Sequence, residues 1–454
     1  MHIDRRTFVK GAMGASLGTL GASALPKLAQ NPSALPAPDS SGIDHIVVVT
    51  MENRSFDHLL GWLPGAKTPA GLSYVDKSGA AHAPYQLTSY TGCGHPDPDH
   101  SYDQSRVAYD NGHLDGFLRA GKNDTYAIGY YTAKDIPFYA SLAQTYMTCD
   151  SWFASILGPT FPNRMFLWAA QTDRLGDSIN LSSLPTIFDR LSRAGVSHRY
   201  YFNNVPFLAL WGLKYVLSTS LFANFLDDAA HGTLPSVSFV DPVYTVLDDG
   251  TGNDDHPHAD IRNGDAFLYK VFNALATGPK WANTVLMVVF DEWGGFFEHV
   301  APPRVVAPNN TDTDLVGGAA LLGFRVPVVI ASPFTFGTGI NSALYDHTAV
   351  LKLIEWRWKL QPPLTARDAS TDINNPAASF NFTSPYPKLP GTIAKASPVF
   401  ALPCFGGGIF SPSVANTEGS NKEEAASEVD EFAALAKSPT TQQFMAHPHI
   451  RSGK

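Results

Sequence analysis

The sequence predicts an α/β fold in which helices cover both faces of a mostly parallel sheet. Its 454 residues are 44% hydrophobic and 16% charged, so the chain can bury a large core. Short β-branched runs that suit buried strands alternate with segments of helical spacing. The strand-like runs are Ile43–Met51, Val285–Phe290 and Val326–Ala331, and the helix-like segments are Ile136–Thr145, Pro162–Gln171 and Tyr345–Leu360. Because interleaved strands and helices build parallel sheets, this order indicates a large, loop-rich enzyme domain.

The N-terminal segment is typical of an export signal. Paired Arg5 and Arg6 precede a mild apolar stretch rich in Gly and Ala, as in signals read by the twin-arginine export machinery. A basic, disordered N-terminus is the alternative. Small residues at positions 22–24 and again before Gln30 both offer cleavage sites. We therefore expect a signal peptide over residues 1–29, a linker over 30–42, and a protein that is periplasmic or secreted.

Charge and hydropathy argue against two classes of partner. Removal of residues 1–29 takes away four basic residues and one acid, which changes 32 basic and 41 acidic residues to 28 and 40. The resulting net charge of −12 argues against nucleic acid as the main partner. No later run is long and apolar enough to span a bilayer, so we expect no transmembrane anchor.

The three cysteines, Cys93, Cys149 and Cys404, allow at most one disulfide. None belongs to a CxxC pair, which argues against a zinc ribbon or a redox motif. We interpret them as small buried apolar residues or as one covalent link with one thiol left over.

Oxygen-bearing side chains follow two of the predicted strands. Glu52 and Asn53 end the first apolar run, and Asp291 and Glu292 end the run Thr284–Phe290. Ligands of parallel sheets bind beyond the carboxyl ends of the strands, and carboxylate and amide oxygens are ligands of hard divalent cations. Either pair alone is as consistent with solvated polar residues at a strand end, or with a helix cap, as with a metal site. Together they predict a metal site, and the two glycines after Trp293 would let backbone approach closely.

Thr160 stands at the predicted start of a helix in "SILGPTFPNRMFLWAAQ". A hydroxyl at a helix N-terminus lies in positive potential among N–H groups, which suits attack on a phosphate. The alternative is that Thr160 is only the helix N-cap. The aromatic stretch "YAIGYYT", Tyr126 to Thr132, could line a lipid or choline pocket, although ordinary packing explains it equally well.

Histidines form a third group of candidates. His100 in "HPDPDHSYD" and His256 in "DDHPHAD" are flanked by acids and prolines, which makes them the best candidates for holding phosphate or protonating a leaving alkoxide. His258, His299 and His347 receive no firm role.

Six of these segments resemble successive blocks of one bacterial family. They are "TMENRSFDHLLG", "HPDPDHSYDQSRVAYDNGHLDGF", "DIPFYASLAQTYMTCDSWFASILGPTFPNR", "FDEWGGFFEHVAPP", "GFRVPVVIASPF" and "YDHTAVLKLIEWRW". In order and spacing they are similar to the phosphoesterase family that contains phosphatidylcholine-type phospholipases C and acid phosphatases. The resemblance runs from about Ile43 to about Phe382.

The resemblance implies an alkaline-phosphatase-like α/β/α sandwich with a metal-assisted covalent mechanism. It implies that Glu52, Asn53, Asp291 and Glu292 bind a divalent metal together with the hydroxyl of the nucleophile, Thr160. His100 and His256 match family histidines that lie around the phosphate. Glu298 stands where the family commonly has Asp, which keeps the carboxylate and changes its reach. Calcium, magnesium or manganese suits the oxygen ligands, while nearby histidines would also admit zinc or iron.

The resemblance therefore favours a phospholipase C that hydrolyses phospholipid diesters through a phosphothreonine intermediate. A broad acid phosphatase acting on small phosphate monoesters is the alternative within the family, and an exported binding protein without catalysis is the alternative outside it. We expect a catalytic domain over residues 43–410. A polar, mobile tail with one amphipathic helix is expected over 411–454.

Overall fold

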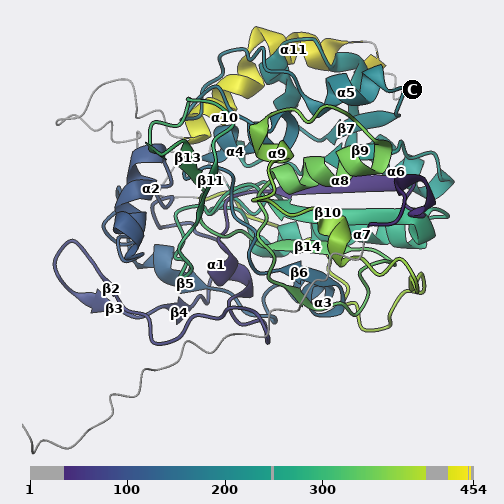
Figure 1. The fold of residues 1–454 in the computed structure, drawn as a ribbon. Coiled ribbons are helices and arrows are strands. Elements are labelled where there is room, and N and C mark those ends of the chain that lie inside the picture. The colour runs from purple at the N-terminus through teal and green to yellow at the C-terminus, as the bar shows by residue number, and fades with distance from the viewer. Residues whose placement is uncertain (1–34, 247–249, 405–427, 448, 451–454) are drawn as a thin grey trace, which may run out of the picture. The chain divides into compact units, whose positions relative to one another are not determined.

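The computed structural model describes residues 35–246, 250–404, 428–447 and 449–450 (Figure 1). The expected signal peptide lies outside these residues, and so do residues 411–427, 448 and 451–454 of the expected tail. Within the described ranges, no helix is both long and apolar enough to cross a bilayer.

An eight-stranded sheet forms the centre of the domain, in the order β15-β6-β14-β10-β1-β9-β7-β8 (Figure 1). Every pairing in it is parallel except the two that β14 makes with β10 and β6. Its strands are β1 (His45–Met51), β6 (Met147–Cys149), β7 (His198–Phe202), β8 (Thr219–Leu221), β9 (Val237–Val240), β10 (Thr284–Phe290), β14 (Val328–Ala331) and β15 (Ile340–Asn341). The predicted mostly parallel sheet is confirmed.

Helices cover both faces of this sheet, so the three-layer α/β/α prediction is also confirmed (Figure 1). One face carries α4 (Thr160–Ala169), α5 (Ile187–Arg193) and α8 (Thr348–Trp358), and the other carries α3 (Pro137–Thr145), α6 (Phe222–His231) and α7 (Ile261–Thr277). Further helices are α1 (Phe56–Leu60), α2 (Tyr102–Tyr109), α9 (Ala366–Ala369), α10 (Glu428–Lys437) and α11 (Pro439–Ala446). Short 3-10 helices are η1 (Pro38–Ser40), η2 (Asp110–Gly112), η3 (Thr125–Ile128), η4 (Phe207–Trp211), η5 (Val216–Ser218), η7 (Trp281–Asn283) and η8 (Pro376–Ser379).

Strand β1 lies at the centre because its sequence is apolar on both faces. All seven of its residues are buried, and it pairs in parallel with β9 on one side and β10 on the other. A strand buried on both faces reads as a continuous run of Val and Ile, which is the pattern of "HIVVVT".

Strand β14 differs from the parallel arrangement because of how the chain returns to the sheet. Between β10 and β14 the chain passes through loops and a small sheet and forms no crossover helix. Parallel neighbours need a crossover that carries the chain back to the starting end of the sheet. Without one, β14 runs antiparallel to β10.

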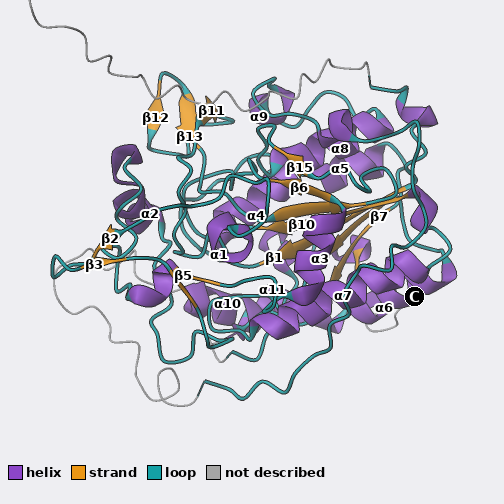
Figure 2. Cartoon of the chain, turned by 90° about the horizontal axis from the view of Figure 1, so that it is seen from below, coloured by secondary structure: helices purple, strands orange, loops and turns teal. Residues whose placement is uncertain are grey.

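Three small sheets stand apart from the central one (Figure 2). They consist of β11 (Arg304–Val306), β12 (Leu315–Val316) and β13 (Ala319–Leu321); of β2 (Tyr74–Val75) and β3 (Ala81–His82); and of β4 (Tyr85–Gln86) and β5 (Gly129–Tyr130).

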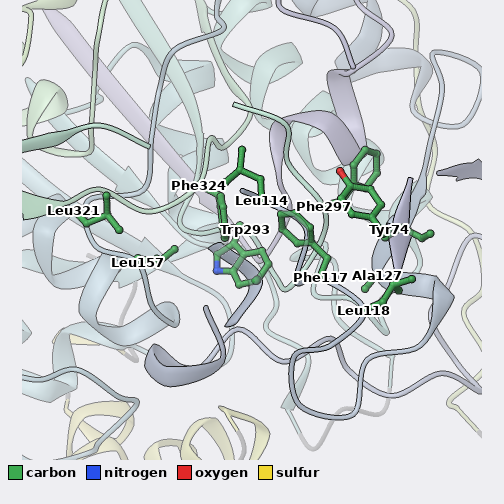
Figure 3. Packing of buried hydrophobic residues seen from close by; sticks show 12 residues of the cluster. Tyr74, Leu114, Phe117, Leu118, Ala127, Leu157, Trp293, Phe297, Leu321 and Phe324 are labelled. Carbon is green, nitrogen blue, oxygen red and sulfur yellow. The ribbon is translucent and has the colours of Figure 1, made fainter. Parts of the chain in front are cut away.

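A second hydrophobic cluster supports the loops between these small sheets (Figure 3). Trp293 is fully buried there, with its ring 4.6 Å from that of Phe324 and 5.8 Å from that of Phe117. Because Trp293 directly follows Glu292, this packing fixes the loop that carries the two predicted metal ligands after β10.

The C-terminal segment differs from the expected polar, mobile tail. Where one helix was expected, the described part contains two, α10 and α11. Phe432 and Phe444 are buried, with their rings 4.9 Å from Tyr244 and 6.1 Å from Phe202, respectively. Sparse apolar residues in a polar segment are enough to dock a short helix when they meet an aromatic surface.

Cys93 and Cys404 form a disulfide, and Cys149 is a buried free thiol on β6. The interpretation of the cysteines as one covalent link with one thiol left over is confirmed. The link joins the loop before α2 to the last residue described before the gap at 405–427.

Candidate active site

The strand register brings the two predicted ligand pairs together. Met51 is paired with Phe290, and the N–H of Asp291 donates to the carbonyl of Met51 at 3.0 Å. Glu52 and Asp291 therefore leave the sheet side by side. Asn53 then adopts a left-handed conformation, with φ of 54°, and its N–H donates to Asp291 Oδ1 at 3.1 Å. Asn tolerates this conformation better than most residues with a Cβ.

Two glycines allow the loop after β10 to press against neighbouring backbone, as the sequence predicted. A Cβ on Gly294 would overlap the carbonyl of Asn53, and one on Gly295 would lie 2.5 Å from the carbonyl oxygen of Pro98. Both glycines have positive φ, which side chains with a Cβ rarely adopt. Glu292 is fixed in this loop because its Oε2 accepts the N–H of Gly294 at 2.8 Å.

Thr160 is the first residue of α4, and its hydroxyl faces the end of β1. Thr160 Oγ1 lies 3.1 Å from Asn53 Oδ1 and 3.3 Å from Glu52 Oε2, and all three side chains are fully buried. The N-cap of α4 is Pro159, so the alternative of Thr160 as a mere N-cap is wrong. The N–H of Phe161 donates to Asp177 at 2.7 Å, so a carboxylate already occupies that helix-end donor.

Asn163 fixes the turn that leads into Thr160. Its side-chain amide donates to the carbonyls of Ile156, Gly158 and Pro159 at 3.0–3.2 Å and accepts the N–H of Ile156 at 3.1 Å. Side-chain bonds of this kind replace the backbone partners that a non-helical turn lacks.

Arg164 is a site residue that the sequence reasoning missed. It is fully buried and forms ion pairs with Glu52, with Asp291 at 3.2 Å and with Asp241 at 3.0 Å. Burial lowers the pKa of Arg164, but these carboxylates outweigh it and raise the pKa well above its usual value. A sequence signal existed, because Arg164 follows Thr160 by four residues, which places both on one face of the helix.

The residues present fit a divalent cation. Among the described residues, the carboxylates of Glu52, Asp241 and Asp291 share the one guanidinium of Arg164, and Glu292, also fully buried, directly follows Asp291 in the sequence. A fully buried cluster with excess negative charge is costly unless a cation compensates it. The donors around Thr160 are carboxylate, amide and hydroxyl oxygens, which suit a hard ion.

Of the two candidate histidines, His100 contacts two of the predicted ligands, and His256 lies in a loop whose residue Asp254 accepts the N–H of Glu52. His100 Nε2 lies 3.8 Å from Glu292 Oε1 and 3.5 Å from Asn53 Nδ2. His256 Nε2 lies 3.6 Å from Asp97 Oδ2, in the loop that leads to His100. His258 Nε2 bonds to the carbonyl of His95 at 3.0 Å and so joins the two loops.

His347 holds the backbone of a predicted metal ligand. Its Nε2–H donates to the carbonyl of Asp291 at 2.5 Å, and its Nδ1 accepts the indole N–H of Trp152 at 3.3 Å. Burial lowers the pKa of His347 to about 4, so the ring is neutral near pH 7.

His299 belongs to a separate cluster. Its Nδ1 bonds to Asp57 at 2.5 Å, and ligand atoms of Asp57, Glu298 and His299 lie within 4.8 Å of one another. Such a group is compatible with a metal, but the guanidinium of Arg325 already lies 3.0 Å from Asp57 and 2.7 Å from Glu298. Burial nevertheless raises the pKa of Glu298 to about 7.

In the stretch from Tyr126 to Thr132, some aromatic residues pack in the protein interior and another lines a cavity. Tyr126 and Tyr131 are buried, whereas Tyr130 lines a cavity of about 400 Å³ together with Trp62 and Phe297.

The sequence of the chain is similar to a family of known proteins. The model of the Phosphoesterase family matches residues 43–361. Non-specific phospholipase C6 of Arabidopsis thaliana is 31% identical over 399 residues, which cover 80% of this chain and 76% of the relative. Phospholipase C B of Mycobacterium tuberculosis is 30% identical, over 84% of this chain and 86% of the relative. Among solved structures, a protein of the alkaline phosphatase superfamily from Vibrio parahaemolyticus matches with 8% identity and a TM-score of 0.36, over 74% and 72% of the two chains.

Proposed function

The chain belongs to the Phosphoesterase family, and from that premise we propose that it is a phospholipase C that hydrolyses phospholipid diesters with Thr160 as nucleophile. Relatives that cover most of its length are named phospholipases C, which are phosphoric diester hydrolases. The proposal that the protein only binds a ligand fits the site less well, because a binding module has no need of a hydroxyl among buried oxygen ligands.

The observation that carries the proposal is the buried hydroxyl of Thr160 against Glu52 and Asn53. These three residues come from two segments, the end of β1 and the start of α4. Their convergence places the Thr160 hydroxyl, the proposed nucleophile, within hydrogen-bond distance of two groups. These are the carboxylate of Glu52, which can accept its proton, and the amide oxygen of Asn53.

Glu52, Asn53, Asp291, Glu292 and the Thr160 hydroxyl are the residues that would hold a divalent metal. A bound ion lowers the pKa of the hydroxyl and neutralises charge on the phosphoryl oxygens. Arg164 bonds to one oxygen of Glu52 and leaves the other, Oε2, toward Thr160.

The chain's own residues then account for the two displacements. Thr160 Oγ1 attacks phosphorus while its proton passes to Glu52, and the bond from phosphorus to the glycerol oxygen breaks. His256 or His100 protonates the departing alkoxide. Water then attacks the phosphothreonine and gives a proton back to the same histidine. The bond from phosphorus to the threonine oxygen breaks as that oxygen recovers its proton from Glu52, and the phosphorylated head group is released.

The test compares a diester with its own monoester on one preparation of metal-quantified protein. Phosphatidylcholine and phosphatidic acid, matched in acyl chains and presented in the same detergent micelles, differ in the choline ester only. Faster release of phosphocholine than of inorganic phosphate supports the phospholipase C proposal. Faster hydrolysis of phosphatidic acid would overturn it in favour of the monoester phosphatase alternative.

We further propose that the protein is exported by the twin-arginine route, which is supported by Arg5 and Arg6 ahead of an apolar stretch. Replacement of both arginines by lysine should leave the protein in the cytoplasm of the producing cell. Cell fractionation measures the export. If the variant with both arginines replaced were exported as efficiently as the unchanged protein, this route would be contradicted.

A further inference from the structure

The loop that carries His256, defined here as residues 254–258, is held in a demanding conformation. Asp255 has φ of 73° and is buried, and a Cβ on Gly264 would overlap its carboxyl oxygen Oδ1. Left-handed backbone at a residue other than Gly costs energy and persists only where surrounding contacts fix it. The hydrogen bonds to residues 254–258 therefore show which neighbours fix the backbone of this loop.

Four consecutive carbonyls of the loop are hydrogen-bonded from outside it. The N–H of Glu52 donates to the carbonyl of Asp254 at 2.8 Å. Arg54 donates from Nε to the carbonyl of Asp255 at 2.6 Å and from Nη2 to that of His256 at 3.0 Å. The hydroxyl of Tyr126 donates to the carbonyl of Pro257 at 2.7 Å. Two of these donors, Glu52 and Arg54, belong to the turn that carries the proposed metal ligands.

Burial of the Arg54 guanidinium carries a high desolvation cost, which a gain in stability alone does not explain. Its side chain is fully buried, and its described hydrogen-bond partners are two carbonyls, the ring of His58 at 2.8 Å and the hydroxyl of Tyr126 at 3.4 Å. Burial raises the pKa of Asp255, a buried carboxyl of this loop, well above its usual range. None of the described hydrogen bonds of the Arg54 side chain goes to a carboxylate, and uncharged partners recover little of the desolvation cost of a buried guanidinium.

We propose that Arg54 and Tyr126 are positioning residues for His256: they fix its backbone against the turn that carries Glu52 and Asn53. The inference rests on the proposed function, in which His256 acts beside the phosphate. When the two segments are rigidly coupled, His256 keeps a fixed position relative to Thr160. The group that protonates the leaving alkoxide and the nucleophile then stay correctly placed on either side of the phosphate. Misplacement by about 1 Å can cost about 100-fold in rate.

The test is a double-mutant cycle on phosphatidylcholine hydrolysis, with kcat and KM measured separately. The variants are Tyr126→Phe, Arg54→Lys, His256→Gln and the two pairs that combine each of the first two with His256→Gln. Tyr201→Phe is the control, because it removes a partly buried hydroxyl bond of the same 2.7 Å length, to Asp228, far in sequence from the site residues. Urea unfolding of every variant separates rate effects from loss of folding.

We expect His256→Gln to lower kcat by about 100-fold or more. Tyr126→Phe should lower kcat about 2- to 10-fold, and Arg54→Lys by more, with little change in KM. In the His256→Gln background each should cause no further loss of kcat, while Tyr201→Phe leaves kcat unchanged. Non-additive losses of this kind identify residues that act through His256.

Two outcomes would overturn the inference and are distinguishable. If His256→Gln is impaired but the second substitution multiplies the loss, Arg54 and Tyr126 act independently of His256 and only this inference fails. If His256→Gln turns over at nearly the original rate, the proposed role of His256 fails and the inference with it. Should Arg54→Lys not fold, the smaller Tyr126→Phe change decides alone.

Discussion

Thr160 Oγ1 lies 3.1 Å from Oδ1 of Asn53, although 107 positions separate the two residues in the sequence. The contact exists because α4 begins directly over the carboxyl end of β1. Parallel sheets gather such residues at one edge, where strand ends and helix starts meet. The proposed chemistry depends on this meeting of a helix start with a strand end.

Replacement of the proposed nucleophile should abolish activity and leave the fold intact. Thr160→Ala is expected to lower kcat on phosphatidylcholine by about 1,000-fold or more, because it removes the hydroxyl that forms the proposed covalent intermediate. Thr160→Ser keeps a hydroxyl and should retain measurable turnover. Thr148→Ala is the control, since Thr148 is equally buried and donates only to the carbonyl of Ala143. Nearly unchanged turnover by Thr160→Ala would contradict the nucleophile assignment.

Loss of Arg164 should destabilise the protein strongly. Arg164→Leu leaves Glu52, Asp241 and Asp291 without their shared guanidinium, and removal of one partner from buried ion pairs costs about 3–5 kcal/mol. Urea unfolding at pH 7 measures the change. Arg119→Leu is the control, because its pairs with Asp110 and Asp115 are partly exposed and such pairs contribute about 1 kcal/mol or less. If both variants lowered the unfolding free energy by the same small amount, Arg164 would not compensate the charge of the three buried carboxylates.

Removal of the metal should abolish activity reversibly. Prolonged treatment with a strong chelator is expected to reduce both the bound metal, measured by elemental analysis, and the turnover of phosphatidylcholine. Addition of a divalent cation should restore turnover. Glu52→Gln should weaken cation binding measured by calorimetry, because it removes a charged oxygen ligand. A chelated protein that contains no metal and keeps its full activity would refute the metal proposal.

Glu355 should make the protein less stable as the pH rises. Burial and the nearby Asp368 raise its pKa from 4.5 to about 9, and among the described residues its Oε1 has no hydrogen-bond partner. Between these values the folded state binds more protons than the unfolded state, so stability is lost as pH rises toward 9. The slope from one such proton is at most about 1.4 kcal/mol per pH unit. Glu355→Gln should flatten the unfolding free energy between pH 5 and 9, and an unchanged slope would contradict the raised pKa.

The C-terminal helix α10 should contribute to the stability of the catalytic domain. Phe432 is 3% exposed, and its ring lies 5.3 Å from that of Phe161, the residue after the proposed nucleophile. Phe432→Ala is expected to lower the unfolding free energy by about 3–5 kcal/mol, as for other buried aromatic residues. Phe400→Ala is the control, because Phe400 is 88% exposed. A loss no larger than that of the control would mean that α10 does not pack on the domain in solution.

The parts of the fold that were predictable are those with a local pattern. The run that became β1 is buried on both faces, and Glu52 and Asn53 directly follow it, so both the strand and the site at its end could be read from adjacent residues. The helix α4 was predictable for the same reason, since Gly158 and Pro159 mark the turn before it, although it begins two residues before the expected Pro162.

The parts that were not predictable depend on contacts distant in sequence. The four-residue spacing places Arg164 on the same helix face as Thr160, but it does not indicate that Arg164 will meet Asp241 and Asp291. Arg54 likewise reads as a charged residue after a strand, and its role follows only when the loop at residues 254–258 folds against it. The direction of β14 and the docking of Phe432 are decided by the path and the surface of the rest of the chain.

The stereochemical course at phosphorus tests the central claim, attack by Thr160, most directly. A phosphorothioate analogue of phosphatidylcholine with known configuration at phosphorus would be hydrolysed in water labelled with oxygen-18, and the configuration of the released head group would be determined. Each in-line displacement inverts phosphorus, so an intermediate on Thr160 followed by water attack gives net retention. Attack by Thr160 predicts retention. Inversion would mean that water attacks the diester in one step, and it would contradict the account.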